Sequence, residues 1–355
     1  MTGLSLRPLT KFGFEITYFL SKFVLDKVCK MRTEIASLGR AAAIERLFEN
    51  TGFQNEQSTV ICEKGECLLA HKILLEGVDF DLVFNPLKHL GYKAVLAVAG
   101  EIYAKFHQPN SLSVTLGISK KFCYEDIEEL WQGIIAAAKE HSIKHLSLDL
   151  VPSMNGLCIS IAVCGTQRKG NLEKIVPSKN MDLICLTGDL GAAYMGLHVL
   201  QREKVSFTDE SKQPDLSKYK YVLGSYLNPE INPGILSRFI EAGIYPSKGY
   251  FITKGLAEAI HRLTKDTGFG AKIYLEKIPL ASGTIEMAEE VGMEPVTAAF
   301  NGGDDYKFIF TVPIECHDIV RKEFHDFDII GHLAKPEVGA VMVTPEGAEF
   351  EIKTL

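Results

Sequence analysis

The sequence has little that would bind nucleic acid or cross a membrane. Its 38 lysines and arginines are outnumbered by 45 aspartates and glutamates, which gives a net charge of −7. A general nucleic-acid-binding protein needs a concentrated basic face to displace counterions from phosphates, and no such face is visible. The chain is 46% hydrophobic and 23% charged, with a single tryptophan, a composition typical of a globular protein.

The first 30 residues are the nearest approach to a membrane segment, because they are basic and rich in aromatic residues. Glu15, Lys22 and Asp26 interrupt every apolar stretch before it reaches the ~20 residues that a span requires. We therefore expect an N-terminal extension, residues 1–30, that does not cross a membrane. Three alternatives remain open: a helix docked on the fold, an interfacial helix, or a segment upstream of a true start at Met31.

Paired cysteines with metal-binding spacing are also missing. Only Cys62 and Cys67 lie close together among the eight cysteines, and no second pair accompanies them, so a zinc knuckle is excluded. Most of the others fall inside apolar runs, for example Cys164 and Cys185. These positions predict buried, reduced thiols and favour a reducing cytoplasm.

The length of 355 residues predicts two domains. The polar, turn-rich stretch 166–180 is the expected linker between an N-terminal α+β domain, residues 31–165, and an α/β domain, residues 181–355. The expected N-terminal strands are 67–75, 78–84, 111–119, 144–151 and 157–165, with helices at 86–106 and 124–140. Trp131 shares its helical face with other apolar residues, which predicts packing rather than a ligand platform.

The second domain is expected to begin with a buried strand, a glycine turn and a helix within 182–200. Helices near 233–242, 254–267 and 283–291 then alternate with strands at 272–276, 307–312, 328–332 and 339–343. No Ser–His–Asp type of triad is apparent, and His198 and His261 are interpreted as helix-face residues.

Several stretches together resemble the thiamine-monophosphate kinase family, within the superfamily of aminoimidazole ribonucleotide synthetase. They are "LLEGVDFD" (74–81), "HLGYKA" (89–94), "LTGDLGAAYMGL" (186–197), "NGGDDYKFIFTVP" (301–313) and "IGHLAKPEVG" (330–339). The resemblance implies an N-terminal domain that dimerises through its sheet into a barrel-like interface and an α/β C-terminal domain. It also implies ATP bound with several magnesium ions between the domains.

The sequence departs from the family at the positions that would hold magnesium. The family's "GDD", "TD", "NxSD", "GGDT" and "SDGL" motifs here read "CEK", "HK", "VAGE", "SLDL" and "TKGL". Glu63, Glu101 and Asp149 keep carboxylates, whereas Lys64, Lys72 and Lys254 replace aspartates. A single charge about 5 Å from a divalent ion contributes on the order of 6 kcal/mol, so three reversals should abolish the cluster.

The substrate-side positions differ as well. The family's "EGVHF" histidine is Asp79, and its "GGEDYE" turn is "GGDDYK", in which Gly302, Gly303 and Asp305 match and Asp304 shortens the acid. Gly302, Gly303, Asp304 and Asp305 either contact a ligand or build a turn. Gly188 in "TGDLG" either cradles a phosphate at a helix N-terminus or forms a tight turn. Lys72 and Lys254 are candidates for phosphate binding, or for salt bridges with Asp149 and Glu101.

Two functions remain open from the sequence. The first is a catalytically degraded relative of the kinase that acts as a binding or partner subunit, either as a homodimer or beside an intact paralogue. The second is an active ATP-dependent kinase for thiamine monophosphate or another phosphorylated small molecule, in which the lysines take over part of magnesium's role. No cofactor is certain, although ATP and Mg²⁺ are expected if the protein is active.

Overall fold

The computed structural model describes residues 33–38, 40–53, 67–167, 174, 176–208 and 215–353. The N-terminal extension and Glu63 therefore lie outside the described residues. In these ranges no helix combines the length and the apolar character that a membrane span requires.

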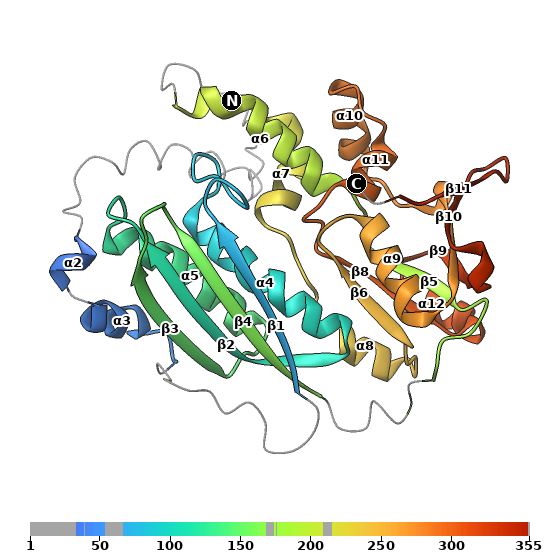
Figure 1. The fold of residues 1–355 in the computed structure, drawn as a ribbon, viewed down its shortest axis with the longest axis horizontal. Coiled ribbons are helices and arrows are strands. Elements are labelled where there is room, and N and C mark those ends of the chain that lie inside the picture. The colour runs from blue at the N-terminus through green and yellow to red at the C-terminus, as the bar shows by residue number, and fades with distance from the viewer. Residues whose placement is uncertain are drawn as a thin grey trace, which may run out of the picture.

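A four-stranded sheet and two long helices form the N-terminal part of the chain (Figure 1). The strand order is β1-β4-β2-β3, in which β2 and β3 are parallel and the other neighbours antiparallel. Helices α4 and α5 cover one face of the sheet, and the described residues leave its other face open. The bounds are α2 Ile35–Leu38, α3 Arg40–Phe48, β1 Cys67–Leu75, α4 Leu87–Ala104, β2 His107–Ile118, α5 Tyr124–Glu140, β3 His145–Pro152 and β4 Cys158–Gln167.

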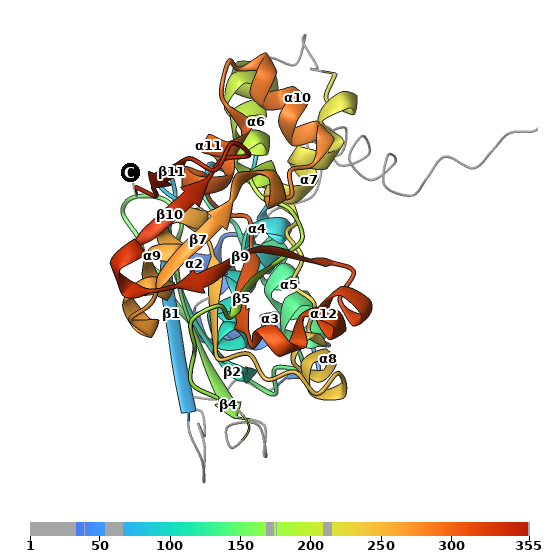
Figure 2. The ribbon, with the colours of Figure 1, turned by 90° about the vertical axis from the view of Figure 1, so that its right-hand side faces the viewer.

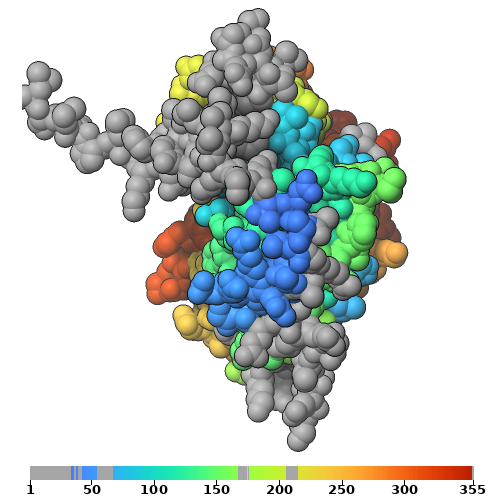
Figure 3. All heavy atoms as spheres, turned by 90° about the vertical axis from the view of Figure 1, so that its left-hand side faces the viewer, coloured from blue at the N-terminus to red at the C-terminus, as the bar shows by residue number. Residues whose placement is uncertain are grey.

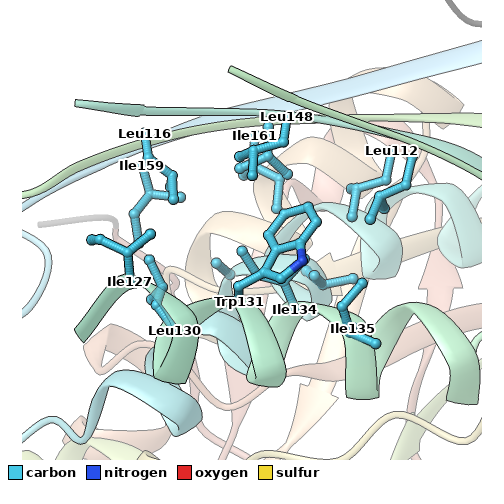
Figure 4. Close-up of a cluster of buried hydrophobic side chains, with 14 of the residues drawn as sticks. Leu112, Leu116, Ile127, Leu130, Trp131, Ile134, Ile135, Leu148, Ile159 and Ile161 are labelled. Carbon is cyan, nitrogen blue, oxygen red and sulfur yellow. The ribbon is translucent and has the colours of Figure 1, made fainter. Parts of the chain in front are cut away.

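Trp131 lies at the centre of the core between α5 and this sheet (Figure 4). Its side chain is 2% exposed and contacts the ring of Phe48 on α3, with 5.2 Å between the ring centroids. The prediction that Trp131 packs in the core is therefore confirmed. Helices α2 and α3 form the outer surface on this side of the molecule (Figure 3).

A seven-stranded mixed sheet with helices on both faces forms the C-terminal part (Figure 2). The strand order is β11-β10-β7-β9-β5-β8-β6. The bounds are β5 Leu183–Thr187, α6 Ala192–Thr208, α7 Lys220–Leu227, α8 Ile235–Glu241, β6 Lys248–Ile252, α9 Leu256–Thr267, β7 Gly270–Tyr274, α10 Ser282–Glu290, α11 Pro295–Asn301, β8 Lys307–Val312, α12 His317–Glu323, β9 Phe327–Ala334, β10 Ala340–Val343 and β11 Glu349–Glu351.

Helix α4 belongs to the cores of both parts. One side of it packs with α5 and the N-terminal sheet, and the opposite side packs with α8, α12 and the C-terminal sheet. Gly91 on α4 faces Gly133 on α5, where an added Cβ would lie about 2.0 Å from a carbonyl oxygen of the facing helix. These glycines let the two backbones approach closely, so α4 is held between the two sheets.

Two sequence predictions about the fold are wrong. Residues 78–84 do not form a strand, because the chain turns at Gly77 with φ +83° and Asp79 accepts a hydrogen bond from the Leu75 amide. Most of the described cysteines are also not buried. Only Cys185 is, while Cys67, Cys123, Cys158, Cys164 and Cys316 are partly exposed.

The barrel-like interface is not a feature of one chain. Within the described residues, the N-terminal sheet is an open layer and does not close on itself.

Candidate functional site

A pocket of about 370 Å³ lies where the chain leaves β6, beside the first turns of α6. Aromatic and apolar side chains form one wall, and a lysine, an aspartate and a glycine turn form the other. The lining residues are Ala193, Tyr194, Leu197, Tyr226, Thr253, Lys254, Asn301, Gly302, Gly303 and Asp304.

The turn 302–306 is fixed by close backbone contacts. An added Cβ at Gly302 would lie 2.2 Å from the carbonyl oxygen of Ala298, so only glycine fits there. Asp304 and Tyr306 both have positive φ, +61° and +54°. Their amides donate to the carbonyls of Thr253 and Ile252, at 3.0 Å each, which joins the turn to the end of β6. The turn is therefore a built structural element of the pocket wall.

Lys93 lies on α4, the helix that packs on the N-terminal sheet, and its side chain contacts the same turn. Its Nζ donates to Asp304 Oδ2 at 2.9 Å and to the carbonyl oxygen of Tyr226 at 3.1 Å. The ammonium group also lies 3.9 Å from the centroid of the Tyr226 ring. Burial lowers the pKa of Lys93, and the charge of Asp304 opposes that shift. Asp304 is thus the counter-ion of a buried lysine as well as part of the pocket wall.

Asp305 points away from the pocket and under helix α6. Its Oδ1 accepts a hydrogen bond from the Gly191 amide at 2.9 Å, while its Oδ2 is buried with no partner among the described residues. Burial raises the pKa of this carboxyl to about 8. Asp305 therefore ties the turn to the start of α6 and so joins the two walls of the pocket.

Three lysines replace family aspartates. Lys64 lies outside the described residues, and of the other two, Lys254 is in the pocket lining and Lys72 is not. Lys254 is exposed and stands directly before α9. Lys72 lies on β1, where its charge contributes to the lowered pKa of Lys93. Lys72 faces the same helix layer as Leu74, because side chains alternate along a strand.

The carboxylates that would bind magnesium have different environments. Glu101 on α4 is paired with Arg262 on α9, with both of its oxygens 3.4 Å from the guanidinium nitrogens. Asp149 lies on β3 and Lys72 on β1, at opposite edges of the N-terminal sheet. Three strand spacings of about 4.8 Å separate these edges, so Asp149 and Lys72 cannot form a salt bridge within one chain.

The "VAGE" stretch that contains Glu101 is packed against the C-terminal sheet. An added Cβ at Gly100 would lie 2.3 Å from Cζ of Phe251, a fully buried residue of β6. The ring of Phe251 takes the space beside this stretch, and Arg262 neutralises its carboxylate. Among the described residues, no three histidine, cysteine, aspartate or glutamate side chains converge on a point where they could hold a metal ion. These residues do not fit a magnesium cluster.

The remaining candidates have structural contacts. Asp79 is exposed and caps the turn after β1. Gly188 has φ +60° and its amide donates to the carbonyl of Asp326, so "TGDLG" is a tight turn beside Lys307. His198 on α6 packs edge-to-face on Tyr194, and His261 on α9 bonds the carbonyl oxygen of Ile352.

Sequence reasoning missed three residues of this region. Lys93 could have been found, because a single lysine in the apolar run "YKAVLAVAG" is expected to be buried and paired. Tyr226 and Arg262 gave no such signal. Their roles depend on contacts with residues more than 100 positions away in the sequence.

This chain is similar in sequence to known proteins of two names. It is 26% identical over 242 residues to the thiamine-monophosphate kinase of Rhodopirellula baltica, which covers 68% of this chain and 67% of that protein. It is 24% identical over 281 residues to a putative hydrogenase expression/formation protein of Methanocaldococcus jannaschii, covering 77% of this chain and 78% of that protein. No protein-family model matches the chain.

A solved structure described as AaThiL complexed with AMPPCP and TMP superposes with a TM-score of 0.68, at 21% identity. The superposition covers 91% of this chain and 98% of that one. The chain therefore shares the fold of this solved structure and is similar in sequence to thiamine-monophosphate kinases.

Proposed function

We propose that this chain is a catalytically degraded relative of thiamine-monophosphate kinase that binds a phosphorylated small molecule without magnesium. One observation carries the proposal: Glu101, a carboxylate kept at a family metal position, is paired with Arg262 instead of being free for a metal. A carboxylate that neutralises a guanidinium is a poor ligand for a cation that prefers free oxygens.

The pocket described above has side chains suited to binding a phosphorylated ligand. Lys254 offers an ammonium group to a phosphate, and Tyr194 and Tyr226 offer aromatic surface to a ring. Asp304 is engaged by Lys93 on one oxygen, so it adds less repulsion toward an anion than a free carboxylate would. The ligand we propose is therefore a small phosphate ester with a ring.

Calorimetry with ATP and with thiamine monophosphate, each with and without Mg²⁺, tests this proposal. We expect binding of a phosphorylated ligand that is unchanged by the metal, and no diphosphate product when all three components are combined. Lys254→Ala should weaken binding at least tenfold, whereas Lys265→Ala, an exposed lysine at the other end of α9, should not. Magnesium-dependent binding or robust diphosphate formation would refute the proposal.

The alternative is an active kinase in which Lys72 and Lys254 replace part of magnesium's charge. It is favoured by the exposed position of Lys254 beside an intact glycine turn. It predicts turnover in the wild type that falls in Lys72→Ala and Lys254→Ala without loss of fold. Measurable turnover that neither substitution lowers would remove its rationale.

We also propose that two copies of the chain pair through the open face of the N-terminal sheet. Leu69 and Ile73 on β1 are 65% and 54% exposed on this face. The neighbouring strands present small side chains there, such as Ala162, Ser113 and Ser160, which allow a close approach of a second sheet. A heterodimer with an intact paralogue would use the same surface.

A further inference from the structure

The open face of the N-terminal sheet brings two cysteines together from distant parts of the sequence. Cys67 is the first residue of β1, and Cys164 lies near the end of β4. The register pairs Cys67 with Thr166 and Leu69 with Cys164, so the two cysteines are diagonal neighbours on the same face.

The two thiols are in contact and are partly exposed. Burial raises the pKa of Cys164, and a hydrogen bond with Cys67 raises it further. Neither sulfur is in a disulfide bond, and the Cys67 sulfur also lies 4.0 Å from the carbonyl oxygen of Leu68. The side chains thus already meet across the strands, although no disulfide joins them.

We propose that Cys67 and Cys164 are a reversible redox pair that closes to an intrachain disulfide when a small-molecule disulfide is the oxidant. The Cys67 thiolate attacks the oxidant, expelling one of its sulfurs as a thiolate and leaving a mixed disulfide. Cys164 then attacks the Cys67 sulfur and expels the second thiol. Two protein thiols are oxidised, and one small disulfide is reduced to two thiols.

The position of the pair indicates a labile bond rather than a permanent one. Diagonal partners have Cα atoms about 7–8 Å apart, which exceeds the usual span of a disulfide, so the backbone must move as the bond closes. Cys67 is the end residue of β1, an edge strand that pairs only with β4 among the described residues, so few backbone contacts oppose its movement. Bonds closed under such strain are readily reduced, as regulatory disulfides are.

Closing the bond fixes the start of β1 against β4. Strand β1 carries Leu69 and Ile73 on the proposed pairing surface and Lys72 on the other face. The redox state of the pair therefore controls the position of the edge that a second copy would contact. Both cysteines belong to one chain, so the bond is intrachain. The proposed pairing covers this face, so the oxidant reaches the two thiols in the unpaired chain.

Peptide mapping of the full chain tests the pair directly. The protein is diluted until sedimentation shows single chains and is equilibrated with mixtures of reduced and oxidised glutathione. Free thiols are then alkylated, and cross-linked peptides are identified by mass spectrometry. We expect a Cys67–Cys164 peptide in the wild type that disappears on re-reduction. Cys158→Ser is the matched control, because Cys158 lies on the same strand and face without a cysteine neighbour, and it should leave the bond unchanged.

Cys67→Ser and Cys164→Ser should each abolish the cross-linked peptide. Three results would overturn the proposal: a bond from Cys67 to Cys62 or another cysteine, a bond between two chains, or mixed glutathione disulfides that never resolve. Thiols that stay reduced in the oxidised mixture would overturn it as well.

Discussion

Lys93 shows how one residue links the two halves of the molecule. It is the buried cation at the boundary between α4 and the turn 302–306, and it satisfies both Asp304 and the carbonyl of Tyr226. Lys93→Met removes the charge while keeping most of the volume, and it leaves Asp304 without its counter-ion. Because Asp304 is partly exposed to solvent, we expect a loss of about 1–3 kcal/mol in the free energy of unfolding.

Urea denaturation measures that loss, and Lys88→Met is the control. Lys88 is an exposed lysine on the same helix, and its replacement should change the stability by less than about 0.5 kcal/mol. Equal effects of the two substitutions would mean that the contact of Lys93 with Asp304 contributes nothing.

Asp305 should make stability depend on pH. Its pKa is raised to about 8 in the folded protein, mainly by burial, above the ordinary value of 3.8. The fold therefore favours the protonated acid, and this contribution is complete below about pH 4 and is lost as the pH rises through 8. Asp305→Asn keeps an acceptor for the Gly191 amide and does not titrate. As the pH rises from 4 to 8, we expect the variant to gain stability relative to the wild type. Denaturation at several pH values in this range measures the free energy of unfolding of both proteins. Parallel plots of this free energy against pH would contradict the prediction.

At the scale of elements, helix α4 packs closely on strand β6 at Gly100. The ring of Phe251 fills the space that a Cβ would need, and this ring is itself packed against Tyr306 and Phe308. Gly100→Ala should therefore cost about 1–3 kcal/mol, because the buried ring has no room to retreat. Gly224→Ala is the matched control within α7, where an added Cβ meets nothing within 4 Å. That substitution should stabilise the protein by about 0.5–1 kcal/mol through helix propensity.

Thermal or urea denaturation of the two glycine variants compares these expectations directly. If Gly100→Ala is as stable as the wild type, the packing of α4 on β6 is looser than the close contact indicates. The family serine at this position would meet the same ring, which is why restoring it is not expected to restore a metal site.

Elements with strong periodicity were predictable from the sequence. The bounds of β1, α5 and β8 agree with the structure, because each combines a clear hydrophobic pattern with a turn signal. Residues 78–84 have the composition of a strand, but Gly77 and the Asp79 cap turn the chain instead. The short elements β6, α7, α11 and α12 were not predicted, because they depend on tertiary packing.

Individual residues of the candidate site were predictable from the sequence, but their salt-bridge partners were not. The glycine turn and the replacement of acidic residues by Lys254 are visible in the sequence. The partners of Glu101 and Asp304 are not, since Arg262 and Lys93 are brought to them by the packing of α4 between the two sheets. The charges in the sequence therefore indicated which family aspartates are replaced, but not which side chains pair with the remaining carboxylates.

At the scale of the whole molecule, the open sheet face is the feature that a single chain leaves unpartnered. Four strands spaced about 4.8 Å apart, with about eight residues each at 3.3 Å, give a face of roughly 19 by 26 Å. That area, about 500 Å², is smaller than the about 800 Å² per partner of a standard interface, so residues flanking the sheet would have to contribute the rest. The exposed aliphatic residues Leu69 and Ile73 lie along one edge, so a second copy would cover them.

Ile73→Lys tests this pairing, because lysine is tolerated on an exposed edge strand but would be buried between two sheets. Sedimentation velocity at micromolar concentration should show a dimer for the wild type and a monomer for the variant. Phe350→Lys is the control, since Phe350 is 52% exposed on β11, in the other sheet. It should remain dimeric. An Ile73→Lys variant that still dimerises would place the contact between copies elsewhere, and a monomeric wild type would remove it. The pocket that Lys254 lines lies outside this face. In either case, ligand binding would be a property of the single chain.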